Sequence, residues 1–112
     1  MKTDYEFLKT EVDGHILTVT INRPDRMNAL HPPAHAEFDE VWNEFDKDEN
    51  LWVGIVTGEG DRAFSAGNDL KFQAEAGGKM DINMASSGFA GLTSRFNLTK
   101  PLIAAVNGVS MG

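Results

Sequence analysis

Residues 51–60, LWVGIVTGEG, contain the stretch that decides the fold. Leu51 to Thr57 form a short apolar run, rich in β-branched residues, which ends at Gly58 and Gly60. A run of this length and composition favours a buried strand over a helix. Strands of this kind are typical of parallel sheets, whose faces are covered by helices. The flanking residues should therefore supply further strands and the helices that cover them.

The residues before this run predict a hairpin and then a helix. Tyr5 to Val12 and His15 to Asn22 are strand-like, and they flank Asp13-Gly14, a pair suited to a type I′ hairpin turn. The second strand alternates, which predicts one buried face, made by Leu17, Val19 and Ile21. Pro32 and Pro33 suit the first turn of a helix, where a missing N–H costs little. Apolar residues then recur at the spacing of an amphipathic helix that covers a sheet, namely Phe38, Val41, Trp42 and Phe45.

The residues after the run complete an alternating pattern. Leu102 to Val106, LIAAV, predict a second buried strand, and Phe89, Leu92 and Phe96 indicate a second amphipathic helix before it. Glu75 to Gly88 show little periodicity and predict a loop. Strand, helix, strand, loop, helix and strand is the order of a parallel α/β sheet. The fold class expected is therefore α/β.

The composition fits one globular domain or part of one. The chain has 112 residues and a formal net charge of -7, which argues against a nucleic-acid surface, because phosphate binding needs clustered Lys and Arg. No cysteine is present, so disulfides and thiolate metal sites are excluded. The start of the chain is too polar for a secretory leader, and no apolar run approaches the roughly 20 residues that span a bilayer. We expect a cytoplasmic protein with no membrane or nucleic-acid partner.

Residues 58–71, GEGDRAFSAGNDLK, are the segment richest in chemical possibilities. Ala66 and Gly67 allow a ligand to approach the backbone closely, and Asn68 and Asp69 are good N-cap residues for a helix that starts near Leu70. Free N–H groups at such a turn can stabilise an oxyanion that develops on a carbonyl oxygen. The plainer alternative is an ordinary glycine-bearing turn with a capped helix. Residues 101–112, PLIAAVNGVSMG, supply a second strand and turn that could present another N–H to the same oxygen.

Taken together, these segments strongly resemble the enoyl-CoA hydratase/isomerase (crotonase) family. The resemblance rests on RAFSAGNDLK and KPLIAAVNGVSMG, and it extends to HILTVTINRPDRMNAL and NLWVGIVTGEGDRAF in the same order. It implies a crotonase-type spiral of ββα units, here incomplete, and a homo-oligomer that is a trimer or a hexamer. It also implies acyl-CoA chemistry through a thioester enolate. Coenzyme A is then part of the substrate, and no separate cofactor is implied.

The resemblance assigns expected roles to particular positions. Asn68 stands where the family presents one backbone N–H of its oxyanion hole, and the second donor falls one residue past Gly112. Lys71 could offer its charge to a CoA phosphate, although a solvated helix lysine is equally expected there. The segments that resemble the family's CoA-binding parts comprise Met27, Ala29, Leu30, Ala66, Gly67, Asp69, Leu70 and Lys71.

Three functions stay open from the sequence. Hydration of a 2-enoyl-CoA leads, and double-bond isomerisation is the alternative, because the position of Asn68 is often Ala in family hydratases and Asn in some isomerase-like members. The third is a non-catalytic acyl-CoA-binding or assembly fragment. We expect residues 1–112 to form the amino-terminal part of a crotonase-like catalytic domain, truncated before the family's acid/base carboxylates and inactive alone.

Two other features receive plainer interpretations. His31 and His35 are four residues apart, but the prolines between them place His31 at or before the helix start and no third ligand is evident, so no metal site is expected. Trp42 and Trp52 are expected to be core residues.

Overall fold

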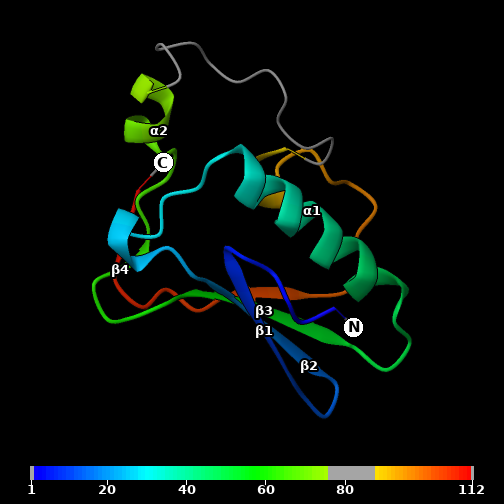
Figure 1. The fold of residues 1–112 in the computed structure, drawn as a ribbon. Coiled ribbons are helices and arrows are strands. Elements are labelled where there is room, and N and C mark those ends of the chain that lie inside the picture. The colour runs from blue at the N-terminus through cyan, green and yellow to red at the C-terminus, as the bar shows by residue number, and fades with distance from the viewer. Residues whose placement is uncertain (1, 76–87, 112) are drawn as a thin grey trace.

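The protein, described here by a computed structural model, places one long helix across a four-stranded sheet (Figure 1). The structure describes residues 2–75 and 88–111, so most of the predicted loop 75–88 lies outside the described residues. The strands are arranged in the order β1-β2-β3-β5. The first pair is antiparallel and the other two pairs are parallel. These elements are β1 (Leu8–Asp13), β2 (Ile16–Ile21), α1 (Pro32–Lys47), β3 (Val53–Gly58) and β5 (Leu102–Ala104).

The predicted α/β class is confirmed, although the sheet is mixed rather than wholly parallel, and two boundaries move. β3 begins at Val53 and ends at Gly58, whereas β5 stops at Ala104, short of the predicted Val106. Among the described residues no helix is long and apolar enough to cross a membrane.

The β1–β2 hairpin forms as predicted, but its turn differs from the predicted type. Asp13 pairs with Ile16, so the two central residues are Gly14 and His15 rather than Asp13 and Gly14. Gly14 has φ +60°, and neither Asp13 nor His15 has a positive φ. A positive φ at the first central residue alone is the pattern of a type II′ turn, which favours glycine there. The type I′ prediction was therefore wrong by one position.

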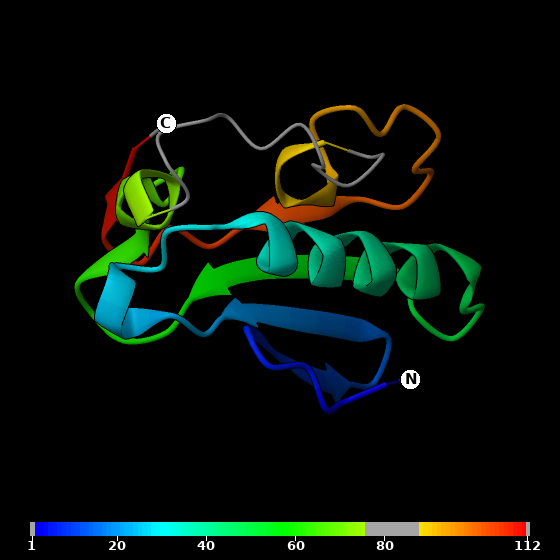
Figure 2. The same ribbon diagram turned by 45° about the horizontal axis from the view of Figure 1, so that its top comes forward.

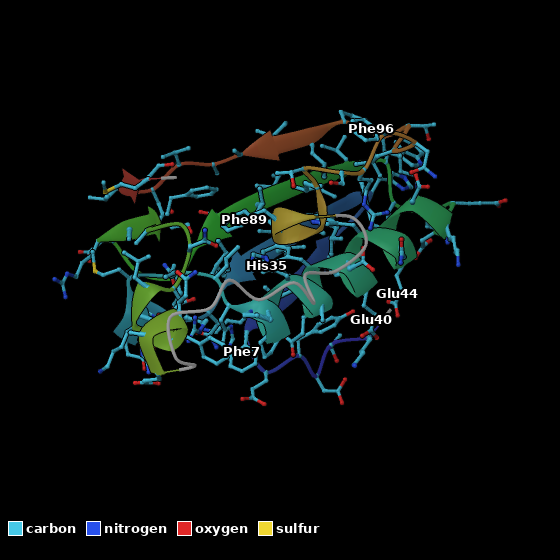
Figure 3. The ribbon with its side chains drawn as sticks, turned by 90° about the horizontal axis from the view of Figure 1, so that it is seen from above. Phe7, His35, Glu40, Glu44, Phe89 and Phe96 are labelled. Carbon is cyan, nitrogen blue, oxygen red and sulfur yellow. The ribbon has the colours of Figure 1, made fainter. Side chains whose placement is uncertain are left out.

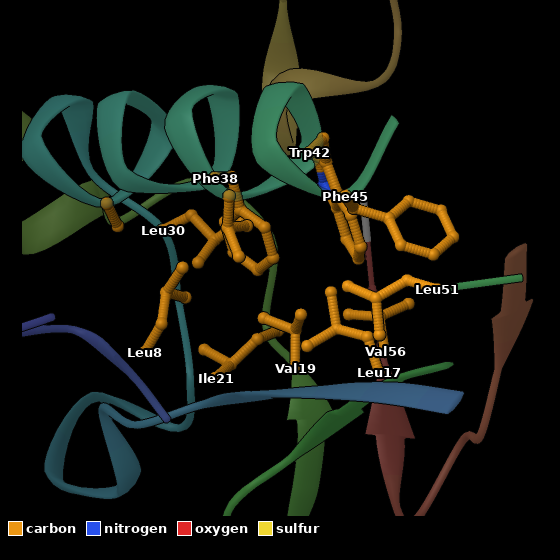
Figure 4. Close-up of a cluster of buried hydrophobic side chains, with 12 residues drawn as sticks. Leu8, Leu17, Val19, Ile21, Leu30, Phe38, Trp42, Phe45, Leu51 and Val56 are labelled. Atoms are coloured by element: carbon orange, nitrogen blue, oxygen red, sulfur yellow. The ribbon is translucent and has the colours of Figure 1, made fainter. Parts of the chain in front are cut away.

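The core lies between α1 and the inner face of the sheet (Figure 4). The alternation in β2 is confirmed, because Leu17, Val19 and Ile21 are buried and face the helix. α1 begins at Pro32, as the two prolines predicted, and its apolar stripe is fully buried. This stripe comprises Phe38, Val41, Trp42 and Phe45. The long helix thus packs on the sheet whose strand ends lead into the site.

The predicted second helix around residues 89–96 is not present. The segment forms only one 3-10 turn, Phe89–Gly91, in which Ala90 has φ +56° and Gly91 has φ +65°. Side chains of α1 hold this irregular backbone: Trp42 Nε1–H donates to the Ala90 carbonyl at 3.0 Å, and the Ala90 N–H donates to His35 Nδ1 at 2.9 Å. Phe89 lies beside His35, with ring centroids 4.5 Å apart, whereas Phe96 lies away from both (Figure 3).

The expectation that both tryptophans are core residues holds for Trp42 and fails for Trp52. Trp42 is fully buried, but Trp52 is 57% exposed. Trp52 precedes the first residue of β3, and its indole stacks on the His15 imidazole with centroids 3.5 Å apart. Ile103 and Val106 are also more than half exposed. Within the described part of the chain, the outer face of the sheet is therefore less covered than the α1 face.

Two short strands and a short helix gather at one end of the molecule. β4 (Ala63–Ser65) pairs in parallel with β6 (Val109–Ser110), and α2 (Leu70–Glu75) follows β4. The sequence did not predict β4 and β6 as strands, but it did predict a helix starting near Leu70, and this is confirmed. Figure 2 shows α2 and the last described residues side by side beyond one end of α1. This end holds the segments expected to carry the chemistry.

Candidate functional site

The turn after β4 leaves the Asn68 N–H without an acceptor among the described residues. The groups on either side of it bind Leu30: the Leu30 N–H donates to the Gly67 carbonyl at 2.8 Å, and the Asp69 N–H donates to the Leu30 carbonyl at 2.9 Å. This single parallel bridge points the Asn68 N–H away from Leu30. Asn68 is exposed. The N–H is therefore available to a ligand, in a turn that is itself held on both sides.

Asp69 caps α2 and ties the turn to the helix. Its Oδ1 accepts the Phe72 N–H at 2.9 Å, and its carbonyl accepts the Gln73 N–H at 3.1 Å. Of the two predicted N-cap residues, Asp69 is the one that performs the role. Because Asp69 is committed to the cap, Asn68 next to it stays outside the helical hydrogen bonds.

Two arginines surround the Asp69 carboxylate. Arg23 Nη1 lies 2.9 Å from Asp69 Oδ2, with both side chains buried, and Arg26 Nη1 lies 3.4 Å from it. Burial alone would raise the pKa of Asp69. The Phe72 N–H and the two guanidinium groups outweigh burial and bring the pKa below its ordinary value. Asp69 is thus a charged structural group in this turn, and its carboxylate is not open to a ligand.

The segment between β2 and α1 forms the other half of the site. Met27 and Asn28 both have left-handed backbones, with φ +53° and +55°. The Asn28 side chain is buried, and its Nδ2 donates to the carbonyls of Ala63 at 2.8 Å and Glu59 at 3.0 Å. The Met27 carbonyl accepts the Ala66 N–H at 3.0 Å. The two segments predicted to bind CoA, 27–30 and 66–71, are therefore joined by hydrogen bonds.

The predicted CoA-binding residues differ in what they offer to a ligand. Ala29 and Leu30 have buried side chains and contribute mainly backbone. Leu70 and Lys71 are exposed on α2. A hollow of about 80 Å³ lies beside the 24–28 turn, lined on its other wall by residues 59–63. It has room for only a small chemical group.

The second predicted donor segment lies next to the first. The Met111 N–H donates to the Ser65 carbonyl at 3.0 Å, so the chain that leaves β6 runs beside the chain that leaves β4. Gly112 lies outside the described residues, and its expected place next to the second donor therefore stays a prediction.

The two histidines do not act together. His35 Nδ1 accepts the Ala90 N–H, whereas His31 lies between the rings of Phe7 and Phe72, at centroid distances of 4.4 and 5.3 Å. His31 Nδ1 is buried with no partner among the described residues. Burial, and secondarily the Arg23 charge, lower the pKa of His31 to about 4. Within residues 2–75 and 88–111, no three His, Cys, Asp or Glu side chains are grouped so that they could hold a metal ion.

Sequence reasoning missed the polar side chains that support the site. Asn107, Arg23 and Asn28 were given no role in the site and occur only within the stretches that resemble the family. In the structure all three are bonded to backbone carbonyls around the turn. Their occurrence in the family-like stretches NRPDRMNAL and AVNG was the one available signal.

The mixed sheet, the covering helix and the paired strands β4 and β6 match solved structures of the crotonase fold, over part of their length. The structure matches a carnitinyl-CoA dehydratase from Mycobacterium avium with a TM-score of 0.79 and 33% identity, covering 91% of this chain and 40% of that one. It matches an enoyl-CoA hydratase from Mycobacterium tuberculosis with a TM-score of 0.77 and 36% identity, covering 91% of this chain and 38% of that one. The predicted crotonase-type fold is therefore confirmed.

The chain belongs to the enoyl-CoA hydratase/isomerase family, whose model matches residues 11–112. It is 47% identical over 107 residues to the carnitinyl-CoA dehydratase of Escherichia coli, a match that covers 96% of this chain and 40% of that protein. It is 48% identical over 99 residues to the Citrobacter koseri protein of the same name, covering 88% of this chain and 37% of that one. The chain thus spans about 40% of the length of the curated relatives it matches.

Proposed function

We propose that this chain supplies one oxyanion donor and part of the CoA-binding surface of an enzyme that interconverts 2-enoyl-CoA and 3-hydroxyacyl-CoA thioesters. The observation that carries the proposal is the Asn68 N–H, which has no acceptor among the described residues although the groups on both sides of it are bonded to Leu30. A donor fixed in this way needs no reorganisation when charge develops on a ligand oxygen.

The chemistry explains why such a donor matters. When water adds to C3 of an enoyl thioester, electron density moves through C2 to the thioester oxygen, and an enolate forms. The Asn68 N–H would donate to that oxygen, and a proton delivered to C2 would complete the hydration. Dehydration of a 3-hydroxyacyl-CoA follows the same path in reverse. A donor of this kind typically contributes on the order of 10²–10³ in rate.

Relatives support this pair of reactions over isomerisation. Three of the similar proteins are named as carnitinyl-CoA dehydratases and one as an enoyl-CoA hydratase. Loss and addition of water across the same carbon–carbon bond are one reaction in two directions. We propose carnitinyl-CoA, a 3-hydroxyacyl thioester with a quaternary ammonium group, as the first substrate to test.

The remaining parts of the proposal concern groups around the donor. Residues 1–112 would be the amino-terminal part of the catalytic domain. Segments 27–30 and 66–71 would hold coenzyme A, with exposed Lys71 near a phosphate. The second donor and the acid/base carboxylates would come from positions after Gly112, as in the family. A trimer or hexamer is proposed for the assembled protein.

The test is a turnover assay on the full-length gene product. When the enzyme hydrates crotonyl-CoA, the absorbance of the conjugated thioester should fall. When it dehydrates carnitinyl-CoA, this absorbance should rise. A 3-enoyl-CoA that gains this absorbance with no change in mass would favour the isomerase. Thioester binding without turnover of any of the three would favour the alternative of a non-catalytic acyl-CoA-binding protein. The matched control is Asp13→Asn, an exposed substitution at the far end of the hairpin.

A further inference from the structure

A buried ion pair joins the two segments that flank the proposed oxyanion donor. We propose that Arg23 and Asp69 are positioning residues, which hold the Asn68 N–H in the direction of the thioester oxygen. This inference rests on the proposed function, since it concerns the same site. The ion pair would set the direction of the Asn68 N–H, in addition to any contribution to folding.

The first observation is that one nitrogen of Arg23 touches both segments. Nη1 lies 2.9 Å from Asp69 Oδ2 and donates to the Ala29 carbonyl at 2.7 Å. Ala29 precedes Leu30, the residue that bonds the turn on both sides of Asn68. Arg23 therefore connects Ala29, which precedes the bridge to Leu30, with Asp69, which follows the proposed donor.

The second observation is that Asp69 divides its two oxygens between two tasks. Oδ1 accepts the Phe72 N–H and starts α2, whereas Oδ2 faces the Arg23 guanidinium. A rotation of the 66–69 turn would break the cap and the ion pair together. The Asn68 N–H has no acceptor of its own among the described residues, so its direction depends on the bridge to Leu30 and on the bonds of Asp69, the next residue.

The third observation is that Arg23 is itself held in place. The Arg23 guanidinium lies over the Phe7 ring, 5.6 Å from the centroid. The backbone N–H of Arg23 donates to Asn28 Oδ1 at 3.1 Å. A buried ion pair is weak support for stability by itself, and the best attested use of such buried polar groups is to fix the register of one segment against another. An apolar pair could fill the same space, but it would not impose one orientation on the turn.

The test uses substitutions that keep shape and remove charge. Asp69→Asn retains an Oδ atom for the Phe72 cap, and Arg23→Gln retains part of the aliphatic stem. The matched control is Asp39→Asn, which removes the ion pair with Arg95, at 3.0 Å, between α1 and the segment that follows Phe89–Gly91. Each variant is measured in the full-length gene product with the substrate on which the wild type is active.

We expect Asp69→Asn and Arg23→Gln each to lower kcat about 10- to 100-fold, because a misplacement of about 1 Å in a catalytic group can cost 10²-fold. KM should change less than threefold, and the double variant should be no slower than the slower single one. Asp39→Asn should keep both constants. Unchanged kcat, or equal losses in kcat and in folded protein by circular dichroism, would overturn the inference.

A second readout separates this inference from the proposed function. In ¹⁵N relaxation measurements without substrate, the Asn68 amide should become more mobile in Asp69→Asn and in Arg23→Gln, but not in Asp39→Asn. If the wild type turns over no acyl-CoA, the proposed function fails while the amide measurement still decides the positioning role. An Asn68 amide that is equally ordered in all variants would show that the pair does not position the donor.

Discussion

Asn107 and Gly58 exchange two hydrogen bonds, one in each direction. The Gly58 N–H donates to Asn107 Oδ1 at 3.0 Å, and Asn107 Nδ2 donates to the Gly58 carbonyl at 2.9 Å. The side-chain amide thus pairs with the last residue of β3 much as a neighbouring strand would. The same Nδ2 also donates to the Gly60 carbonyl at 2.9 Å. The turn before β4, on which the candidate site depends, is therefore held from the segment before β6.

Replacing Asn107 should destabilise this turn. We expect Asn107→Ala to lower the free energy of unfolding by about 1–3 kcal/mol, because it leaves several backbone groups without their partner. Urea denaturation monitored by tryptophan fluorescence measures this change. Asn97→Ala, at an exposed asparagine, is the control and should change little. Equal effects of the two substitutions would show that the Asn107 bonds contribute nothing to stability.

Gly58 should tolerate no side chain. A Cβ at this position would lie 2.5 Å from the Ala63 and Phe64 carbonyl oxygens and 2.8 Å from Asn28 Nδ2. Because backbone must shift, Gly58→Ala should cost about 1–3 kcal/mol. Gly14→Ala is the matched control, because a Cβ at Gly14 would have no atom within 4 Å. Its cost should be roughly 1 kcal/mol of stability, mainly from the φ of +60°. A Gly58→Ala protein as stable as Gly14→Ala in the same denaturation would contradict the crowding argument.

His31 should make the protein less stable in acid. Its pKa falls from 6.5 to about 4 on folding, with burial as the first cause. Between these values the unfolded state binds the proton and the folded state does not, so the free energy of unfolding decreases as the pH is lowered through this window. The total is about 3 kcal/mol, at 1.36 kcal/mol per pKa unit. Urea denaturation at several pH values between 7 and about 4 measures it.

The matched variants are His31→Phe and Phe7→Leu. The first removes the ionisable group and keeps a ring beside Phe72, so the pH dependence should flatten, with a remainder from His35, whose pKa burial also lowers. The second alters a ring that contacts His31 but keeps the imidazole, so the decrease toward low pH should persist. An unaltered pH dependence in His31→Phe would exclude His31 as its source.

Local patterns predicted the elements whose structure depends on a single periodicity. The alternation of Leu17, Val19 and Ile21 identified the buried face of β2, and the prolines identified the start of α1. Periodicity failed around Phe89, because the backbone of the next residue, Ala90, instead accepts a hydrogen bond from Trp42 and donates one to His35, which are distant in sequence. It also failed at Trp52, whose exposure depends on where β3 begins.

The candidate site could be predicted in part for the same reason. The turn that carries Asn68 has glycine and cap residues adjacent in sequence, so it could be located from residues 66–71 alone. The Arg23–Asp69 pair and the Asn107–Gly58 pair join residues far apart in the chain. No spacing rule relates such partners, and only the folded arrangement brings them together.

The last prediction concerns Asn68, at which the backbone, not the side chain, is the proposed donor. In the full-length gene product Asn68→Ala should keep most activity, since the N–H remains. Asn68→Pro should lower kcat about 10²–10³-fold, because proline has no N–H to donate. Thioester binding should weaken less than turnover, since such a donor acts mainly as charge develops.

Folding must be compared first, because proline fixes its own φ and restricts Gly67, whose φ is +86°. Circular dichroism of both variants provides that comparison. The matched control is Asn97→Pro, which removes an exposed N–H far along the chain from the turn. If folded Asn68→Ala were inactive while Asn68→Pro kept its activity, the backbone role would be wrong. The amide side chain would then be the functional group, and double-bond isomerisation would become the leading reaction.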